Sequence, residues 1–403
     1  MKNKLNFWLK IKGCIIIIIL SCIIFFNNHY ALINIFTKFK QAFNLNLNLD
    51  ESNKEGFNNK KFMTPKNKIL YVSRHDGTIA NFDYIAKHLG FNITLLRPNY
   101  EYGGYPECYN NDKCSSFVKE KCSEFDYIII CDTIPDSIVF LINKCNKRII
   151  LEITNRFDFG IKDKNFYKII AKAIKRENII VVENNPFEVY YACEKNVFIK
   201  NYYLIRPIGN PPNNIIMKEH KQYHDIIAII DKYQTSKLLM QKLNDVKLPY
   251  KILPFKHGGP LVLSTYKAII MLPYQVSVMK IMENLRYGVP MIIPSEKLLR
   301  ELIKGKYYFP AKQLFKISNG VKDYIEFYND LYKDYFIYFD SFNDLHNIIK
   351  NTDFKTFREK EKNFVILYEQ KVLKMWAEVL NISIIKENKI SDKAPLCNNK
   401  VFY

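Results

Sequence analysis

Several patterns that identify common classes of site are missing from this 403-residue chain. It has no CxxC pair or cysteine–histidine spacing typical of zinc, no GxGxxG loop typical of a dinucleotide site, and no Asp-x-Asp typical of a bound metal. Glycine (13 residues) and proline (16) are scarce, while 48% of the residues are hydrophobic. A collagen-like or wholly disordered chain is therefore excluded, and we predict neither a bound metal nor a bound cofactor.

Acidic residues are also few, with 40 against 60 basic ones, so the net charge is +20. Such a balance would suit nucleic acid, anionic lipid or a phosphate-bearing ligand. The lysines, however, are scattered through a chain rich in Lys, Asn and Ile, as the codon bias of an AT-rich genome would produce. We therefore predict no nucleic-acid partner.

Charge is absent from Gly13 to Thr37, and Cys14 to Phe26 is almost entirely apolar. About 20 apolar residues span a bilayer, so residues 13–36 are predicted to be a membrane anchor. Lysines before the segment place the N-terminus in the cytosol and the body in the lumen of the endoplasmic reticulum or Golgi, as a single-pass type II protein. A cleaved signal peptide is the alternative, although no small-x-small cleavage pattern follows the apolar core.

Beyond this segment, short apolar runs alternate with stretches of helical pattern. Continuous hydrophobicity within each run is typical of parallel strands covered on both faces. The runs are Lys68–Ser73, Asn92–Leu96, Tyr127–Cys131, Arg148–Ile153, Ile179–Val182, Tyr202–Ile205, Asp225–Ile230, Tyr250–Leu253, Ala268–Leu272 and Pro290–Ile293. They predict an α/β protein with two doubly wound, Rossmann-like domains facing across a cleft, with ligands at the carboxyl ends of the strands.

The domain limits follow from changes in composition. A linker rich in Pro, Gly and Asn at residues 209–214 separates the two predicted sheets. The predicted segments are 1–37 (cytosolic tail and anchor), 38–65 (flexible stem), 66–210 (first domain), 211–350 (second domain), 351–380 (long amphipathic helix) and 381–403 (tail).

The cysteines and two glycosylation sequons agree with a lumenal body. Cys108, Cys114 and Cys122 cluster in a polar segment where a lumenal disulfide could form. The sequons begin at Asn92 and Asn381, of which the second, near the tail, is predicted to be the more accessible.

Residues 269–294 form the most informative stretch. We predict a strand, a short loop, a helix over 276–287 and a second strand, with Gly288 ending the helix. An apolar stripe at helical spacing should face the sheet, and it consists of Val278, Ile281, Met282 and Leu285. Glu283 lies off this stripe, on the same side as Lys280, and the simplest interpretation is an ion pair on a solvated helix face.

This stretch resembles the donor-binding segment of retaining glycosyltransferases of the GT-B fold, where a helix leads to Glu-x-x-x-x-Gly-x-Pro and a strand. Glu283, Gly288 and Pro290 occupy the matching positions. The resemblance implies that Glu283 binds the ribose of a nucleotide sugar. It also implies that the loop and helix N-terminus hold the sugar and pyrophosphate. That loop contains Tyr274, Gln275 and Ser277, and Gln275 stands where the family has a first acidic residue.

Other candidates lie at predicted strand ends. Arg206 and Lys280 could stabilise a leaving pyrophosphate, although Arg206 could equally be a surface residue of a turn. Gly258 and Gly259 either let backbone amides approach the donor or simply form a turn. His75 follows the first strand, as an acid or base for an acceptor hydroxyl or as an ordinary surface histidine.

Arg156 and Asp158 follow the fourth predicted strand. They are predicted to line the acceptor side of the cleft, or else to pair with each other on the surface.

The resemblance implies an enzyme that transfers a sugar from a nucleoside diphosphate sugar to a hydroxyl of a glycan, protein or lipid acceptor. The first domain would bind the acceptor and the second the donor. A non-catalytic binding protein of the same fold is one alternative, motivated by Gln275. A membrane-tethered adhesion or scaffold protein is the other.

Overall fold

The computed structural model describes residues 67–98, 112–161, 163–210, 223–231, 237–254, 256–305 and 324–381. They belong to one compact unit, Thr64–Tyr403. The predicted anchor at 13–36, the stem at 38–65, Cys108 and nearly all of the predicted tail lie outside the described residues. Within these ranges, no helix has both the length and the apolar character needed to cross a bilayer.

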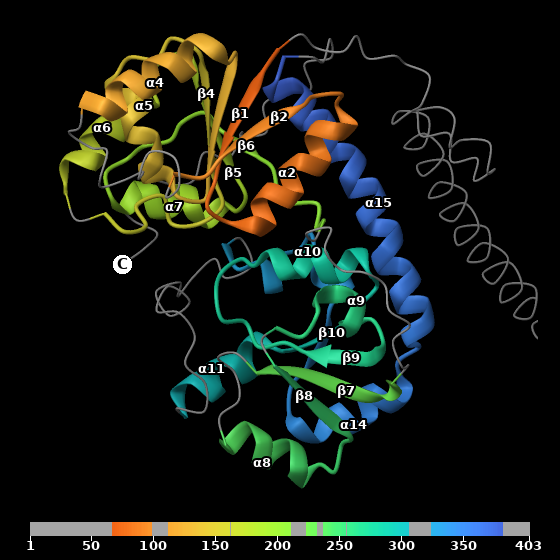
Figure 1. The fold of residues 1–403 in the computed structure, drawn as a ribbon. Coiled ribbons are helices and arrows are strands. Elements are labelled where there is room, and N and C mark those ends of the chain that lie inside the picture. Colours follow the sequence, from red (N-terminus) through yellow and green to blue (C-terminus); the bar gives the residue numbers. More distant parts are fainter. Residues whose placement is uncertain are drawn as a thin grey trace, which may run out of the picture. The chain divides into compact units, whose positions relative to one another are not determined.

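The first sheet has six parallel strands in the order β2-β1-β3-β4-β5-β6 (Figure 1). Its strands are β1 (Ile69–Val72), β2 (Ile93–Leu96), β3 (Tyr127–Cys131), β4 (Arg148–Ile153), β5 (Ile179–Glu183) and β6 (Tyr203–Leu204). Its helical segments are α2 (Asp76–His88), α4 (Asp112–Glu124), η2 (Ile134–Ser137), α5 (Ile138–Ile142), α6 (Asn165–Ala173) and α7 (Pro186–Glu194).

The second sheet has five parallel strands in the order β11-β10-β9-β7-β8. The strands are β7 (Tyr223–Asp231), β8 (Tyr250–Pro254), β9 (Tyr266–Ile270), β10 (Met291–Pro294) and β11 (Ile337–Phe339). The helical segments are α8 (Lys237–Asp245), α9 (Gly259–Leu263), α10 (Met279–Arg286), α11 (Glu296–Lys304), η3 (Glu326–Tyr328), η4 (Lys333–Tyr335), α14 (Phe342–Asn351) and α15 (Phe354–Val379).

Both sheets are therefore doubly wound in the same way. In each, the chain runs from its first strand to a neighbour on one side and then crosses to the other side, so a topological switch point lies beside β1 and beside β7. All ten apolar runs predicted as strands are confirmed, with ends that shift by one or two residues. The prediction omitted β11, whose three residues are too few for a clear periodic pattern.

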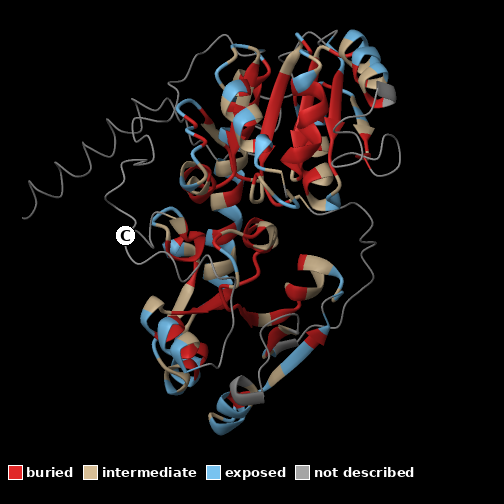
Figure 2. Cartoon of the chain, turned by 90° about the vertical axis from the view of Figure 1, so that its left-hand side faces the viewer, coloured by how far each residue is buried: buried red, intermediate tan, exposed pale blue. Residues whose placement is uncertain are grey.

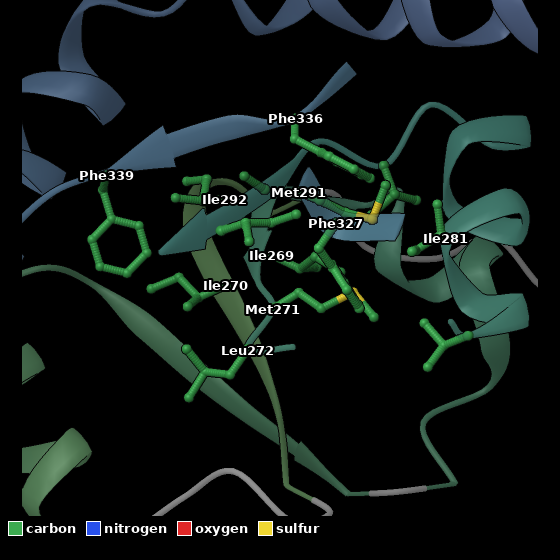
Figure 3. Close-up of a cluster of buried hydrophobic side chains, with 14 of the residues drawn as sticks. Ile269, Ile270, Met271, Leu272, Ile281, Met291, Ile292, Phe327, Phe336 and Phe339 are labelled. Carbon is green, nitrogen blue, oxygen red and sulfur yellow. The ribbon is translucent and has the colours of Figure 1, made fainter. Parts of the chain in front are cut away.

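The cores lie between the strands and their covering helices, as the burial colours of Figure 2 show. In the second sheet, Ile269, Met291 and Phe327 gather against Ile281 of α10 (Figure 3). The predicted stripe on α10 is confirmed, because Val278, Ile281, Met282 and Leu285 are all buried.

The start predicted for this helix is wrong by three residues: α10 begins at Met279, since Val278 has an extended backbone with φ −145°. Its predicted end is confirmed by Gly288, which has a φ of +58°.

The predicted C-terminal helix is confirmed as α15, which contributes to the cores of both sheets. Trp376 packs edge-on against Phe82 of α2, with ring centroids 4.9 Å apart. At the other end of the helix, Arg358 donates to the backbone carbonyls of Ser264 and Gly288 at 3.2 and 2.5 Å. A single helix thereby fastens elements of both sheets, which its amphipathic pattern alone did not reveal.

One disulfide differs from the prediction in its pairing. Cys122 bonds to Cys145, 23 residues further along, rather than to Cys108 or Cys114. Cys114 and Cys193 are also disulfide-bonded, whereas Cys131 in β3 is a free, buried thiol. Cysteine spacing does not determine pairing, because the partner is set by which elements pack together.

Candidate functional site

Loops from the carboxyl ends of the two sheets meet. A Cβ atom placed on Gly77, in the segment after β1, would lie 3.4 Å from Sδ of Met279, the first residue of α10. Nearby, the Asn81 amide oxygen accepts the backbone N–H of Ile208 at 2.9 Å, which holds the connection between the sheets against α2. The two edges predicted to bind ligands are therefore neighbours in space.

On the first sheet, His75 is the N-cap of α2. Its Nδ1 accepts the backbone N–H of Thr78 at 3.3 Å, so the neutral ring carries its proton on Nε2. The preceding residue, Arg74, makes a bidentate ion pair with buried Asp136 at 2.6 and 2.8 Å. These contacts fix the loop and leave Nε2 as the group of His75 that can donate a hydrogen bond.

Asp132 follows β3 at the same edge and has a φ of +67°, a conformation that is strained for a residue other than glycine. Burial raises the pKa of its carboxyl group, and the nearby His75 acts in the opposite direction. Such strain beside a switch point is typical of a functional position. The sequence reasoning missed Asp132, although its place directly after a buried strand was a usable signal.

Glu152, near the end of β4, is buried and accepts a 2.9 Å hydrogen bond from the hydroxyl of Tyr71. Burial raises the pKa of this carboxyl to about 7. It lines a cavity of about 10 Å³, which is close to the size of one water molecule. The wall also contains Thr78, Asn81, Thr154, Asn184, Ile205, Arg206, Pro207, Met279 and Trp376. Polar groups of the first sheet, Met279 of α10 and Trp376 of α15 thus surround one small space.

On the second sheet, Lys280 and Glu283 lie on one side of α10, with 3.6 Å between Nζ and Oε2. Their side chains are 21% and 15% exposed, so a ligand can still reach them. The ion pair that the helical spacing predicted is therefore present, although on a partly buried face. It does not exclude a role for either residue in binding a nucleotide.

His257, after β8, joins this cluster. Burial and the positive charge of Lys280 lower the pKa of His257 to about 4, so its ring is neutral at pH 7. Its Nδ1 is buried without a hydrogen-bond partner among the described residues. Gly258 and Gly259 follow with φ values of +92° and +80°, which identifies them as a tight turn that opens α9.

The loop between β9 and α10 is only partly accessible. Gln275 is exposed, whereas Tyr274 and Ser277 are half-buried. The backbone carbonyl of Val276 accepts a 2.9 Å hydrogen bond from the N–H of Glu326 in η3. The loop is therefore supported by a segment about fifty residues further along the chain.

Arg206 is not the surface residue of a turn. It is 4% exposed and lies 3.5 Å from a carboxylate oxygen of Glu326, which is equally buried. The ring of Tyr332 lies 5.0 Å from its guanidinium carbon. Glu326 was missed in the sequence because nothing local distinguishes it from other glutamates.

Arg156 and Asp158 have different partners. Arg156 forms an ion pair with Glu188, and its guanidinium lies 4.7 Å from the ring of Phe187. Asp158 accepts the hydroxyls of Tyr167 and Tyr191 at 2.7 and 3.1 Å. Neither residue lines the cavity beside Glu152. Within the part of the chain that the structure describes, no group of three or more His, Cys, Asp or Glu residues is placed to hold a metal ion.

Neither a protein-family model nor a curated protein matches the sequence. Among solved structures, Anabaena HepE in complex with UDP and glucose is 11% identical, with 78% of this chain and 99% of that chain covered and a TM-score of 0.47. The T4 phage β-glucosyltransferase gives the same identity and coverages, with a TM-score of 0.42. The UDP-GlcNAc 2-epimerase of Neisseria meningitidis, bound to UDP-GlcNAc, is 11% identical, with 78% and 100% covered and a TM-score of 0.40. At these values, the function of this chain has to be argued from its own residues.

Proposed function

We propose that this protein transfers a sugar from a nucleoside diphosphate sugar to an acceptor hydroxyl. The observation that carries the proposal is the close approach of the start of α2, which follows β1, to the start of α10, at Gly77 and Met279. Doubly wound sheets bind ligands beyond the carboxyl ends of their strands. Two such edges in contact place a donor and an acceptor next to each other, as a group transfer requires.

The donor is assigned to the second sheet. Glu283 accepts hydrogen bonds from the ribose hydroxyls, in agreement with the Glu-x-x-x-x-Gly-x-Pro resemblance. Lys280, beside it, supplies positive charge to the diphosphate as its bond to the sugar breaks. The neutral ring of His257 offers an unpaired nitrogen to the nucleotide.

The acceptor is assigned to the first sheet, with Asp132 as the base. Its raised pKa suits a carboxylate that takes the proton of an acceptor hydroxyl as that oxygen attacks the anomeric carbon. The diphosphate leaves with the electrons of the broken bond, and the configuration is inverted. His75 donates from Nε2 and orients the acceptor or the carboxylate. Inversion differs from the retaining outcome that the sequence resemblance implies, and the configuration of the product distinguishes the two.

The proposal includes a location. Residues 13–36 anchor the chain in the membrane of the endoplasmic reticulum or Golgi, and the body lies in the lumen. The uncharged segment Gly13–Thr37 and the Cys122–Cys145 disulfide support this, because disulfides persist in oxidising compartments.

A thermal-shift titration of the detergent-solubilised full chain with UDP, GDP, ADP and CMP tests the donor site. A nucleotide that binds only the folded state adds about 2.7 kcal/mol of stability at a concentration of 100 Kd. We expect one nucleotide to raise the melting temperature and Glu283→Ala to weaken its binding at least about tenfold, since buried hydrogen bonds to a ligand are lost. Asp132→Asn is the matched control, because it should bind the nucleotide normally and lose transfer.

No shift with any nucleotide would contradict the proposal and favour an adhesion or scaffold role. Binding without turnover would favour the non-catalytic alternative that exposed Gln275 motivates, and Gln275→Glu should then raise activity.

A further inference from the structure

The ion pair between Arg206 and Glu326 has no part in the chemistry proposed above, yet among the ion pairs of the described residues it is the one with both side chains almost fully buried. Both side chains are 5% exposed, and their charged atoms are 3.5 Å apart. Arg206 follows β6 of the first sheet, whereas Glu326 begins η3 beside the second. A buried ion pair contributes little net stability because of its desolvation penalty, so a role in placing other groups is a better explanation for it.

Glu326 holds the start of α10 in two ways. Its backbone N–H donates to the carbonyl of Val276 at 2.9 Å. Burial raises the pKa of its carboxyl group, and the nearby Ser277 side chain and Val278 backbone N–H act in the opposite direction. Val278 is the N-cap of α10, and its own apolar side chain cannot accept an amide hydrogen. The carboxyl group of Glu326 therefore lies beside the last residues of the loop that leads into α10.

We propose that Glu326, oriented by Arg206, is a positioning residue that sets the donor loop 274–278 at the N-terminus of α10. A negative group at this helix end is favourable because of the helix dipole. The side chain of Asn185, the N-cap of α7 in the first sheet, lies near the same carboxyl. Glu326 thus connects the donor loop to two groups of the first sheet. The consequence for nucleotide affinity rests on the proposed function, whereas the positioning itself does not.

Hydrogen–deuterium exchange of the full chain without nucleotide tests the positioning. In Glu326→Gln, we expect the amides of residues 276–283 to exchange about tenfold faster than in the wild type, because the charge that Arg206 orients beside the donor loop is lost. The matched control is Glu361→Gln, since Glu361 is a fully buried carboxyl on α15. This control should leave exchange in residues 276–283 unchanged. Arg206→Lys keeps the charge but not the planar fork, so an intermediate increase is expected.

Unchanged exchange of residues 276–283 in Glu326→Gln would overturn the proposal, as would an equal increase in Glu361→Gln. If Glu326→Gln does not fold, the proposal is tested with Arg206→Lys instead. Exchange of residues 276–283 in Arg206→Lys at the wild-type rate would then contradict the proposal. Nucleotide affinity is measured on the same variants and should fall about tenfold in Glu326→Gln, with transfer by the bound complex less affected. Faster exchange in a protein that binds no nucleotide would contradict the proposed function but support the positioning.

Discussion

Replacing Gly209 by alanine is expected to destabilise the protein by about 4 kcal/mol or more, a loss in the range of severe backbone and packing defects. The residue is buried and has a φ of +75°. An added Cβ would lie 2.3 Å from both the carbonyl carbon and oxygen of Met282, and 2.6 Å from the backbone nitrogen of Glu283. The obstacle is the main chain of α10, which cannot move aside as a flexible side chain would.

The matched control is Gly160→Ala. Gly160 is exposed with a φ of +80°, and a Cβ there would have no neighbour within 4 Å. Gly160→Ala should therefore lower the free energy of unfolding only by what a left-handed backbone costs an alanine, about 1–2 kcal/mol. Urea denaturation of the two variants separates the two causes. An equal loss of stability in the two variants would contradict the close approach of α10 to Gly209.

The second large effect is a pH dependence at Glu152. Its folded pKa is about 7, whereas an ordinary glutamate has 4.5. Between these values the folded state keeps a proton that the unfolded chain has already released, so stability falls as the pH rises. We expect the wild type to lose about 3 kcal/mol relative to Glu152→Gln between pH 4.5 and pH 7, since one pKa unit corresponds to about 1.4 kcal/mol.

The measurement is the difference in free energy of unfolding between the wild type and Glu152→Gln across this range. Glutamine keeps an acceptor for the hydroxyl of Tyr71 and does not titrate. Titrating groups that do not interact with Glu152 are common to both proteins and cancel in the difference. A constant difference from pH 4.5 to pH 8 would mean that Glu152 is ionised with an ordinary pKa.

Much of the fold could be predicted because the strands are buried on both faces. The middle of β4, Ile149–Leu151, is apolar and buried at every position, which separates this strand from the amphipathic helices around it. The short strand β11 was not predicted, since two of its three residues, Ile337 and Tyr338, are only partly buried and carry no distinct pattern. The start of α10 was misplaced because Val276 and Val278 continue the apolar pattern backwards through an extended loop.

The candidate site was predictable only where its residues are close in sequence. Lys280 and Glu283 were paired from helical spacing, and the turn at Gly258 and Gly259 from composition. Arg206 was identified as a candidate, but its buried partner Glu326 lies 120 residues away and no local pattern connects the two.

By itself, the sequence determined the elements and their order: two sets of buried parallel strands, the amphipathic α10 ending at Gly288, and the long α15. These depend on the period of hydrophobic residues and on backbone preferences, both of which are local. Only the tertiary structure decided that α10 packs on Gly209, that Glu326 contacts the loop before α10, and that Asp132 lies beside His75. Such contacts join residues far apart in the chain, and their geometry is set by how whole elements pack.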